Sequence, residues 1–160
     1  MSTDTSWADF HAAEPDFADT VQARFQQHLH HVLATLRKDG SPRVSGLEVN
    51  FRDGELYLGM MYDSWKAKDL LRDPRFALHA NPGEGAAASQ LGDVRVSGRA
   101  TPVTADSEEF ARFVEGVRPP EPFHLFRADV TEAVRTSVED NELVVRSWHP
   151  GAPLRTVRRK

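Results

Sequence analysis

The sequence contains no cysteine, and this absence removes several kinds of chemistry at once. Without a thiol, the chain has no cysteine nucleophile, no cysteine-ligated zinc, no iron–sulfur cluster and no disulfide. Its apolar runs are only a few residues long, well short of the ~20 residues that a membrane-spanning helix needs. We therefore expect no membrane association, and the missing cysteines fit a cytoplasmic location.

Basic residues are in the minority, with 20 Lys and Arg against 24 Asp and Glu and a net charge of −4. A dedicated nucleic-acid binder normally presents a strongly basic face, so nucleic acid is not an expected partner. Residues 1–19 contain neither Lys nor Arg, which excludes a signal or transit peptide there. Sixteen of the twenty cations are Arg, a residue suited to bidentate contacts with phosphate or carboxylate.

A length of 160 residues suits one domain. We expect a loose N-terminal arm over residues 1–14, with at most a short helical turn around Trp7 and Phe10, a folded domain over 15–148 and a C-terminal tail over 149–160. Three short helices are predicted: one from residue 15, one from Ser64 and one capped by Asp106. The first carries an apolar stripe at four-residue spacing, formed by Phe17, Val21, Phe25 and Leu29.

Alternating apolar residues predict seven strands. They cover residues 31–37, 43–51, 56–60, 75–80, 93–103, 123–138 and 143–148. Asp-Gly pairs at 39–40 and 53–54 predict hairpin turns, and residues 81–91 predict a loop. An open sheet of this size would leave apolar faces and edges uncovered. The fold class is therefore mainly β (α+β), a six- to seven-stranded antiparallel barrel with about three short helices.

An ordered series of motifs then carries a resemblance. It comprises His-Val-Leu-Ala-Thr-Leu (31–36), Asp-Gly-Ser-Pro-Arg-Val-Ser (39–45), Asp-Gly-Glu-Leu-Tyr-Leu (53–58) and Ser-Trp-Lys-Ala-Lys-Asp-Leu-Leu-Arg-Asp-Pro-Arg (64–75). The series resembles the pyridoxamine 5′-phosphate oxidase-like FMN-binding split β-barrel family, best over residues 28–104. That family includes FMN-binding oxidoreductases and relatives that use a deazaflavin, coenzyme F420. The resemblance implies a Greek-key split barrel and a homodimer with the cofactor in a groove between two barrels.

Ser64 and Lys66 form a candidate phosphate site at the start of the second helix. The first N–H groups of a helix lack partners within the helix and attract anions. The Ser64 hydroxyl and the Lys66 ammonium would add donors, and Arg43 on a neighbouring strand would add a guanidinium. The alternative is that Ser64 only caps the helix and Lys66 is solvated.

The resemblance implies further cofactor-binding residues. Val44 and Ser45 would run beneath the flavin ring, and Met60 and Met61 would contact the cofactor at the end of the third strand. The C-terminal Trp148 would approach the cofactor of the opposite subunit. Ordinary packing is the alternative for both methionines, and a plug at the barrel end or the dimer seam is the alternative for Trp148.

Two positions depart from the family pattern. Trp65 stands where flavin-binding relatives carry Arg, and Glu48 stands near the place of a Lys in the true pyridoxamine phosphate oxidases. A phosphorylated vitamin would meet the negative charge of Glu48, so that activity is not expected. We predict an FMN-dependent oxidoreductase that acts on a planar small molecule, with the cofactor carrying the chemistry and no catalytic side chain. The alternatives are a coenzyme F420-dependent reductase and a non-enzymatic flavin or small-molecule binding protein.

Other reaction classes find little support. His28, His30 and His31 are too closely spaced at a helix-to-strand junction to place three imidazoles on one face, so no metal site is predicted. The chain has no Gly-x-Ser-x-Gly sequence and no glycine-rich phosphate loop.

Overall fold

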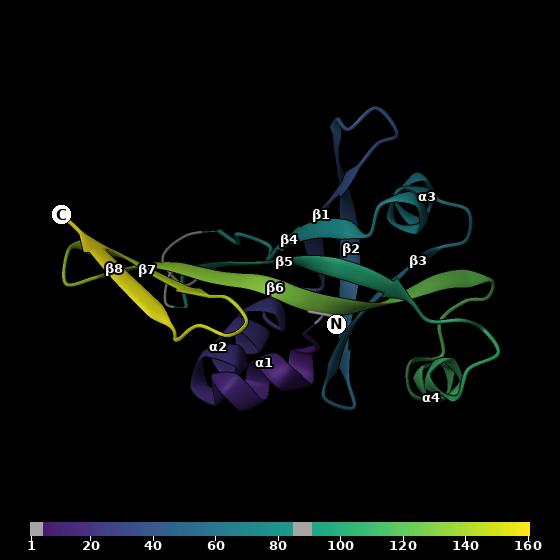
Figure 1. Cartoon of the computed structure of the whole chain (residues 1–160), viewed down its shortest axis with the longest axis horizontal. Helices are drawn as coiled ribbons and strands as arrows, with labels where there is room; N and C mark the ends of the chain where they lie inside the picture. Colours follow the sequence, from purple (N-terminus) through teal and green to yellow (C-terminus); the bar gives the residue numbers. More distant parts are fainter. Residues whose placement is uncertain (1–4, 85–90) are drawn as a thin grey trace.

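The computed structural model describes residues 5–84 and 91–160, and these residues form eight strands in one antiparallel sheet. The strands are β1 (His30–Leu36), β2 (Pro42–Arg52), β3 (Glu55–Met61), β4 (Arg75–His79), β5 (Asp93–Pro102), β6 (Phe123–Glu139), β7 (Glu142–Trp148) and β8 (Arg155–Arg159). Their order is β3-β2-β1-β4-β5-β6-β7-β8, and β3 also pairs with β6. The first six strands therefore close into a barrel, and β7 and β8 extend from it as a hairpin (Figure 1). The predicted split barrel is confirmed.

Two-residue turns set the register of two hairpins. Asp53 and Gly54 join β2 to β3, with Arg52 opposite Glu55, and both turn residues have positive φ. This backbone is the one that an Asp-Gly hairpin turn adopts, so the prediction at 53–54 is confirmed. The same geometry recurs between β6 and β7, where the turn residues at 140–141 also have positive φ.

The long strand β6 joins the barrel to the outer hairpin. Its first residues pair with β3 and its last residues pair with β7, while β5 runs along most of its length. The β5–β6 register shifts between Ser97 and Gly98, so that Thr131 is an extra residue that bulges and bends β6 at this crossing. Gly98 is required there because a Cβ would collide with the carbonyl oxygen of Asp129. The bend directs the end of β6 away from the barrel, where β7 and β8 continue the sheet (Figure 1).

The described residues form four helices: α1 (Trp7–Ala13), α2 (Pro15–Phe25), α3 (Trp65–Arg72) and α4 (Glu108–Val117). Helices α1 and α2 pack together on one side of the barrel, and α3 and α4 lie well apart from each other toward its other end (Figure 1). The main core contains the apolar faces of α1, α2 and α3 together with the inward side chains of the barrel strands.

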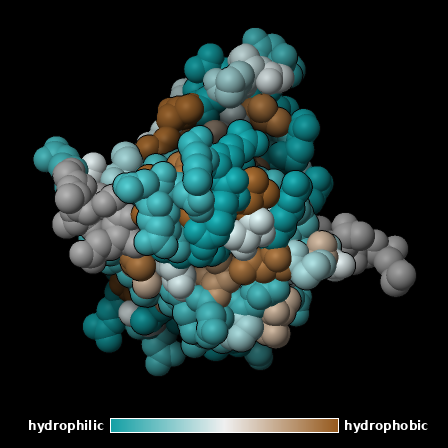
Figure 2. Space-filling view, turned by 90° about the vertical axis from the view of Figure 1, so that its left-hand side faces the viewer, coloured by the Kyte–Doolittle hydropathy of each residue, from teal (hydrophilic) through white to brown (hydrophobic). Residues whose placement is uncertain are grey.

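Both ends of the chain differ from the expectation. The arm predicted over residues 1–14 is not loose at Trp7–Ala13: Ser6 caps a full helix where at most a helical turn was expected, and Trp7 and Phe10 are fully buried. At the other end, the predicted tail over 149–160 contains β8, which pairs with β7. Four of the five residues of β8 are exposed, and the face at this end of the molecule is largely hydrophilic (Figure 2).

Smaller differences concern helix ends. Helix α2 ends at Phe25, so Leu29 does not extend its buried stripe and is exposed. Helix α4 is capped by the Ser107 side chain rather than by Asp106. Within the predicted loop over 81–91, residues 85–90 lie outside the described residues. No helix in the described part of the chain is both long and apolar enough to cross a membrane.

Candidate functional site

Helix α3 lies at the barrel end where β1 finishes and β2 begins. Ser64 has an extended backbone and its hydroxyl accepts a hydrogen bond from the Ala67 N–H at 3.4 Å, which is the N-cap role predicted for it. Ala67 and Leu70 are buried and attach the helix to the barrel core. The first turn of α3 is thereby held beside β2, with its N-terminal N–H groups at the surface.

Lys66 extends from this first turn to β2. Its Nζ donates to the carbonyl oxygen of Gly46 at 2.7 Å, and the side chain is half-buried. Desolvation lowers the pKa of the Lys66 ammonium below its usual range. Within residues 5–84 and 91–160, no carboxylate forms an ion pair with this ammonium. Lys66 is therefore a partly desolvated cation that forms no ion pair with a carboxylate in the described residues.

Arg43 also links β2 to α3, but its charge is already matched. Its Nε donates to Oδ2 of Asp69 at 2.7 Å, and Asp69 is 2% exposed. The Arg43 guanidinium also lies 5.6 Å from the ring centroid of Trp65. Arg43, Ser64 and Lys66 thus all lie along the contact between β2 and α3, and their role in cofactor binding stays a prediction. We call this junction, together with Ser45 and Trp65, the α3 notch.

Ser45 adds a hydroxyl to the notch. Side chains alternate along a strand, so Ser45 lies on the same side of β2 as Arg43, whereas Val44 faces outward and is 68% exposed. The Ser45 Oγ is buried and has no hydrogen-bond partner in the described part of the chain. A buried hydroxyl without a partner costs free energy, and this atom has almost no surface exposed to solvent in the single chain.

The remaining predicted contacts divide between the surface and the core. Met61 is 80% exposed at the end of β3, whereas Met60 is buried in the core. Trp148 is 2% exposed, and its ring centroid lies 4.6 Å from that of Phe10 on α1. The cofactor-binding role predicted for Trp148 is therefore wrong for this chain: its ring fills the core beneath α1.

Sequence reasoning missed two features near the notch. Asp69 was not identified, although a carboxylate between Ala67 and Leu70 on the buried side of a short helix is a detectable signal. Tyr62 and His124 form a stacked pair with ring centroids 4.9 Å apart and an interplanar angle of 7°. Tyr62 is exposed directly after β3, so this pair is accessible from solvent beside α3. No sequence pattern joins residues this far apart in the chain.

The notch does not coincide with a cleft on another part of β2. A cleft of about 520 Å³ lies between the end of α2, the second half of β2 and the end of α4, with Phe25, Phe51 and Val117 among its lining residues. It starts at Val49, three residues beyond Gly46, which corresponds to about 10 Å along a strand. No group of three or more His, Asp or Glu side chains in the described ranges is placed to hold a metal ion.

Comparison with known proteins identifies the family. A family model for pyridoxamine 5′-phosphate oxidase matches residues 17–136, well over half of the sequence. The chain belongs to the pyridoxamine 5′-phosphate oxidase family. The match includes all of the α3 notch, β1 to β5 and most of β6. A search of curated proteins found no match.

Solved structures share the barrel at low sequence identity. PhzG from Burkholderia lata, in complex with tetrahydrophenazine-1-carboxylic acid, has a TM-score of 0.62 and 15% identity over 94% of this chain and 91% of PhzG. A pyridoxamine 5′-phosphate oxidase-related, FMN-binding protein from Nostoc punctiforme has a TM-score of 0.61 and 14% identity, covering 92% and 96%. The heme storage protein HutZ from Vibrio cholerae has a TM-score of 0.55 and 20% identity, covering 74% and 89%. At these identities the neighbours establish the fold alone.

Proposed function

We propose that this chain is an oxidoreductase that binds a flavin-type cofactor, with FMN as the first candidate and the cofactor phosphate in the α3 notch. The observation that carries the proposal is the half-buried Lys66 ammonium. It extends from α3 to the Gly46 carbonyl oxygen on β2 and has no carboxylate partner in the described residues. An anion in the notch would supply the counter-charge that the Lys66 ammonium lacks, so the residues present fit a phosphate. Membership of a family with an FMN-binding neighbour supports this choice of ligand.

Each notch residue has a defined task in this proposal. Lys66 has two further N–H donors beyond the one that Gly46 accepts, and the first turn of α3 adds backbone N–H groups. Arg43 has N–H groups beyond its Nε, and the exposed Trp65 ring lies against its guanidinium. When bound, the cofactor supplies the hydride or electron transfer to a planar small molecule. The chain's own residues bind and orient it.

A second copy of the chain would complete the groove. The outward face of β2, β1 and β4 carries Val44 opposite Ala34, and Ala34 opposite Ala77, with Val32 two residues before Ala34 on the same face of β1. Val32 and Val44 are both exposed in the single chain. An apolar sheet face of this kind commonly marks a protein–protein contact. We assign it to a homodimer that forms through this face of the sheet.

Pyridoxamine 5′-phosphate oxidase activity itself is not proposed. Glu48 is exposed, and its carboxylate lies 3.2 Å from Nε2 of His30. A phosphorylated substrate placed there would approach a carboxylate, which repels it. A non-enzymatic binding protein is the second candidate, favoured by the pairing of Arg43 with Asp69, which withdraws one cation from the cofactor phosphate.

Cofactor titration of the purified chain tests the proposal. FMN and coenzyme F420 are titrated separately, followed by the visible spectrum and by fluorescence quenching. We expect a dissociation constant below about 100 µM, equivalent to roughly −5.5 kcal/mol, for at least one of them. Failure of both to bind at this level would refute the proposal. A second assay distinguishes an enzyme from a binding protein. Planar acceptors are added to the bound, reduced cofactor, and an enzyme should transfer electrons to them faster than the free reduced cofactor does.

A further inference from the structure

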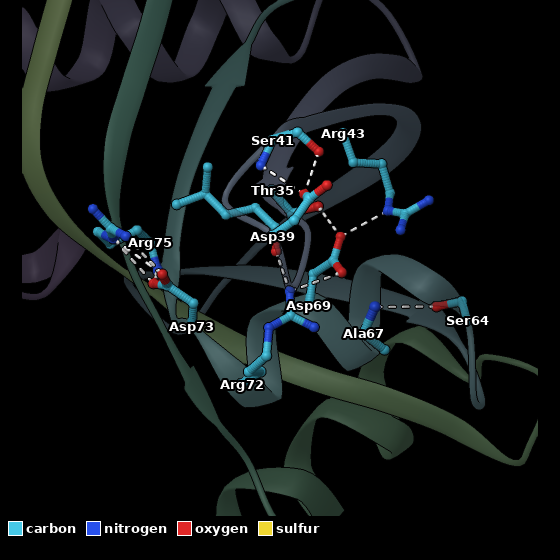
Figure 3. A network of polar contacts seen from close by, with 11 residues as sticks. Thr35, Asp39, Ser41, Arg43, Ser64, Ala67, Asp69, Arg72, Asp73 and Arg75 are labelled. Atoms are coloured by element: carbon cyan, nitrogen blue, oxygen red, sulfur yellow. Dashed lines mark hydrogen bonds and ion pairs between the residues drawn. The ribbon is translucent and has the colours of Figure 1, made fainter.

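Arg52, the last residue of β2, carries a charge that no carboxylate pairs with in the described part of the chain. Glu55 stands opposite it across the β2–β3 hairpin, but the two side chains form no ion pair. The arginines beside α3 are different, because Arg43 and Arg72 both donate to the Asp69 carboxylate (Figure 3). Arg52 is exposed, so its guanidinium is available to an anion from solution.

Helix α4 fixes the position of this guanidinium. A Cβ on Gly116, in the last turn of α4, would collide with Nη2 and Cζ of Arg52, so the guanidinium lies directly against the helix backbone. Glycine destabilises a helix relative to alanine, and here the space that it leaves is occupied by Arg52. The carbonyl end of α4 carries about half a negative charge, which attracts Arg52 and leaves part of its positive charge unmatched.

One side of Arg52 faces the cleft of about 520 Å³ between α2, β2 and α4, which we call the α2–α4 cleft. Val49 and Phe51 on β2 and Val117 on α4 are partly exposed along it. Leu29 also lines it and is 63% exposed, although the sequence predicted a buried position for it. The described lining residues include no Asp or Glu, and the polar ones other than Arg52 are amides and histidines: Gln26, Gln27, His28, His31 and Asn50.

The other side of Arg52 borders a second hollow with a different lining. Asp53 and Glu115 line that hollow together with Arg112. Carboxylates there would repel an anion, whereas the α2–α4 cleft presents apolar side chains and no carboxylate among the described residues. An anion that contacts Arg52 is therefore better accommodated on the side of the α2–α4 cleft.

We propose that the α2–α4 cleft binds a small aromatic monocarboxylate, with Arg52 holding the carboxylate. A guanidinium donates two parallel N–H groups to the two oxygens of a carboxylate. The aromatic body would lie against Phe51 and Val49 and would cover Leu29, and a cleft of this volume suits a small ligand. The cleft is separate from the α3 notch, so this inference goes beyond the proposed function and does not depend on it.

The test compares three probes on four versions of the full chain. The probes are 2-naphthoate, its neutral amide 2-naphthamide, and acetate, which has the charge without the aromatic body. Each is titrated into the wild-type chain, Arg52→Gln, Gly116→Ala and Arg75→Gln, and binding is followed by heteronuclear NMR of the backbone amides. Arg75→Gln is the matched control, because Arg75 is an exposed arginine beside α3 whose guanidinium pairs with Asp73 (Figure 3).

We expect the wild-type chain to bind 2-naphthoate with a dissociation constant below about 1 mM, and about tenfold or more tightly than either other probe. The amide signals of residues 49–52 should shift as it binds. Arg52→Gln should reduce the preference for the acid over the amide to within about threefold. Gly116→Ala displaces the guanidinium without removing its charge, so it should weaken 2-naphthoate binding by about fivefold, whereas Arg75→Gln should leave it within about twofold.

Three results would overturn the inference: a wild-type chain that does not bind 2-naphthoate at this level, equal affinities for the acid and the amide, or shifts confined to other parts of the chain. A purely structural role for Arg52 at the end of α4 would lower the stability of Arg52→Gln and leave its preference for the acid unchanged, which would also refute the proposal. Gly116→Ala should fold, because alanine favours a helix, so a loss of binding in that variant reports on the position of the guanidinium. None of these outcomes depends on whether FMN or coenzyme F420 binds in the α3 notch.

Discussion

Replacing Lys66 by Met distinguishes a ligand-binding lysine from a solvated one, because the two roles change stability and affinity differently. In the unliganded chain the Lys66 ammonium is half-buried and has one carbonyl partner. Desolvation lowers its pKa, so the charged form is disfavoured in the folded state. The thioether of Met lacks this penalty and retains most of the apolar stem. We expect the unliganded variant to be at least as stable as the wild type in urea unfolding.

The pH dependence of stability has a definite sign. A lysine whose folded pKa lies below its unfolded pKa binds fewer protons in the folded state, so the free energy of unfolding rises with pH. For Lys66 this rise should occur as the pH increases through the lowered folded pKa toward 10.5, the unfolded value. The penalty is fully present below the folded pKa. Lys66→Met should lack this component of the rise, which urea titrations at several pH values between 7 and about 10 would reveal.

Cofactor affinity should change in the opposite direction. A hydrogen bond from an ammonium to a phosphate oxygen contributes about 1.5–3 kcal/mol, which corresponds to roughly 10- to 150-fold in the dissociation constant. The loss should be measured by fluorescence titration with FMN and coenzyme F420. Riboflavin, which has no phosphate, should lose much less affinity.

Lys68→Met is the matched control for this experiment. Lys68 belongs to the same helix, but it is exposed, pairs with Asp63 at 3.6 Å and lies over the Trp65 ring. Surface ion pairs of this kind contribute about 0–1 kcal/mol, so its loss should change affinity by less than about fivefold. Equal losses for both lysines, or no loss for Lys66→Met, would refute a phosphate contact at Lys66.

Three further predictions concern the fold and the assembly. Phe10→Ala should lower the free energy of unfolding in urea by about 3–5 kcal/mol. The control Val138→Thr, at an exposed position, should lower it by less than about 0.5 kcal/mol. A small loss for Phe10→Ala would restore the interpretation of a loose arm. Hydrogen bonding to Arg146 lowers the pKa of Glu139 from 4.5 to about 2, so the stability from this pair is present above pH 4.5 and is lost as the pH falls through about 2. Glu139→Gln should abolish this loss of stability in acid titrations followed by circular dichroism. A titration identical to that of the wild type would show that the Glu139–Arg146 pair does not contribute to stability. Val44→Glu should convert a dimer to a monomer in sedimentation velocity, and a wild-type chain that sediments as a monomer would contradict the assigned interface.

The barrel was predictable because its signals are local. Alternating apolar residues mark each strand, and an Asp-Gly pair marks the turn at Asp53 and Gly54, where both residues have positive φ. The end of α3 at Arg72 follows from Asp73 and Pro74, since a proline disfavours helix in the residue before it. These rules involve neighbours in the sequence, so one sequence was sufficient for the elements and for the fold class.

The ends of the chain were not predictable in the same way. Trp7 and Phe10 lie in a short helix without a clear period, and their burial depends on contacts with Phe51 on β2 and with Trp148 on β7. Trp148 was assigned to the cofactor by resemblance, yet α1 covers it. Both errors have one cause. The sequence predicts that an aromatic side chain is buried against another group. Only the fold shows whether that group belongs to a ligand or to a distant part of the same chain.

The pairing of charges in the α3 notch was also not predictable from the sequence. Arg43 and Lys66 look equivalent in the sequence, as two cations placed to meet one phosphate. In the fold they differ because Asp69 is within 2.7 Å of Arg43, whereas Lys66 contacts only a backbone carbonyl among the described residues. The spacing of Asp69 in α3 puts its carboxylate on the buried side, where it pairs with Arg72 as well as with Arg43. A motif of cations therefore indicates an anion site, but only the fold shows which of those cations is already paired with a carboxylate.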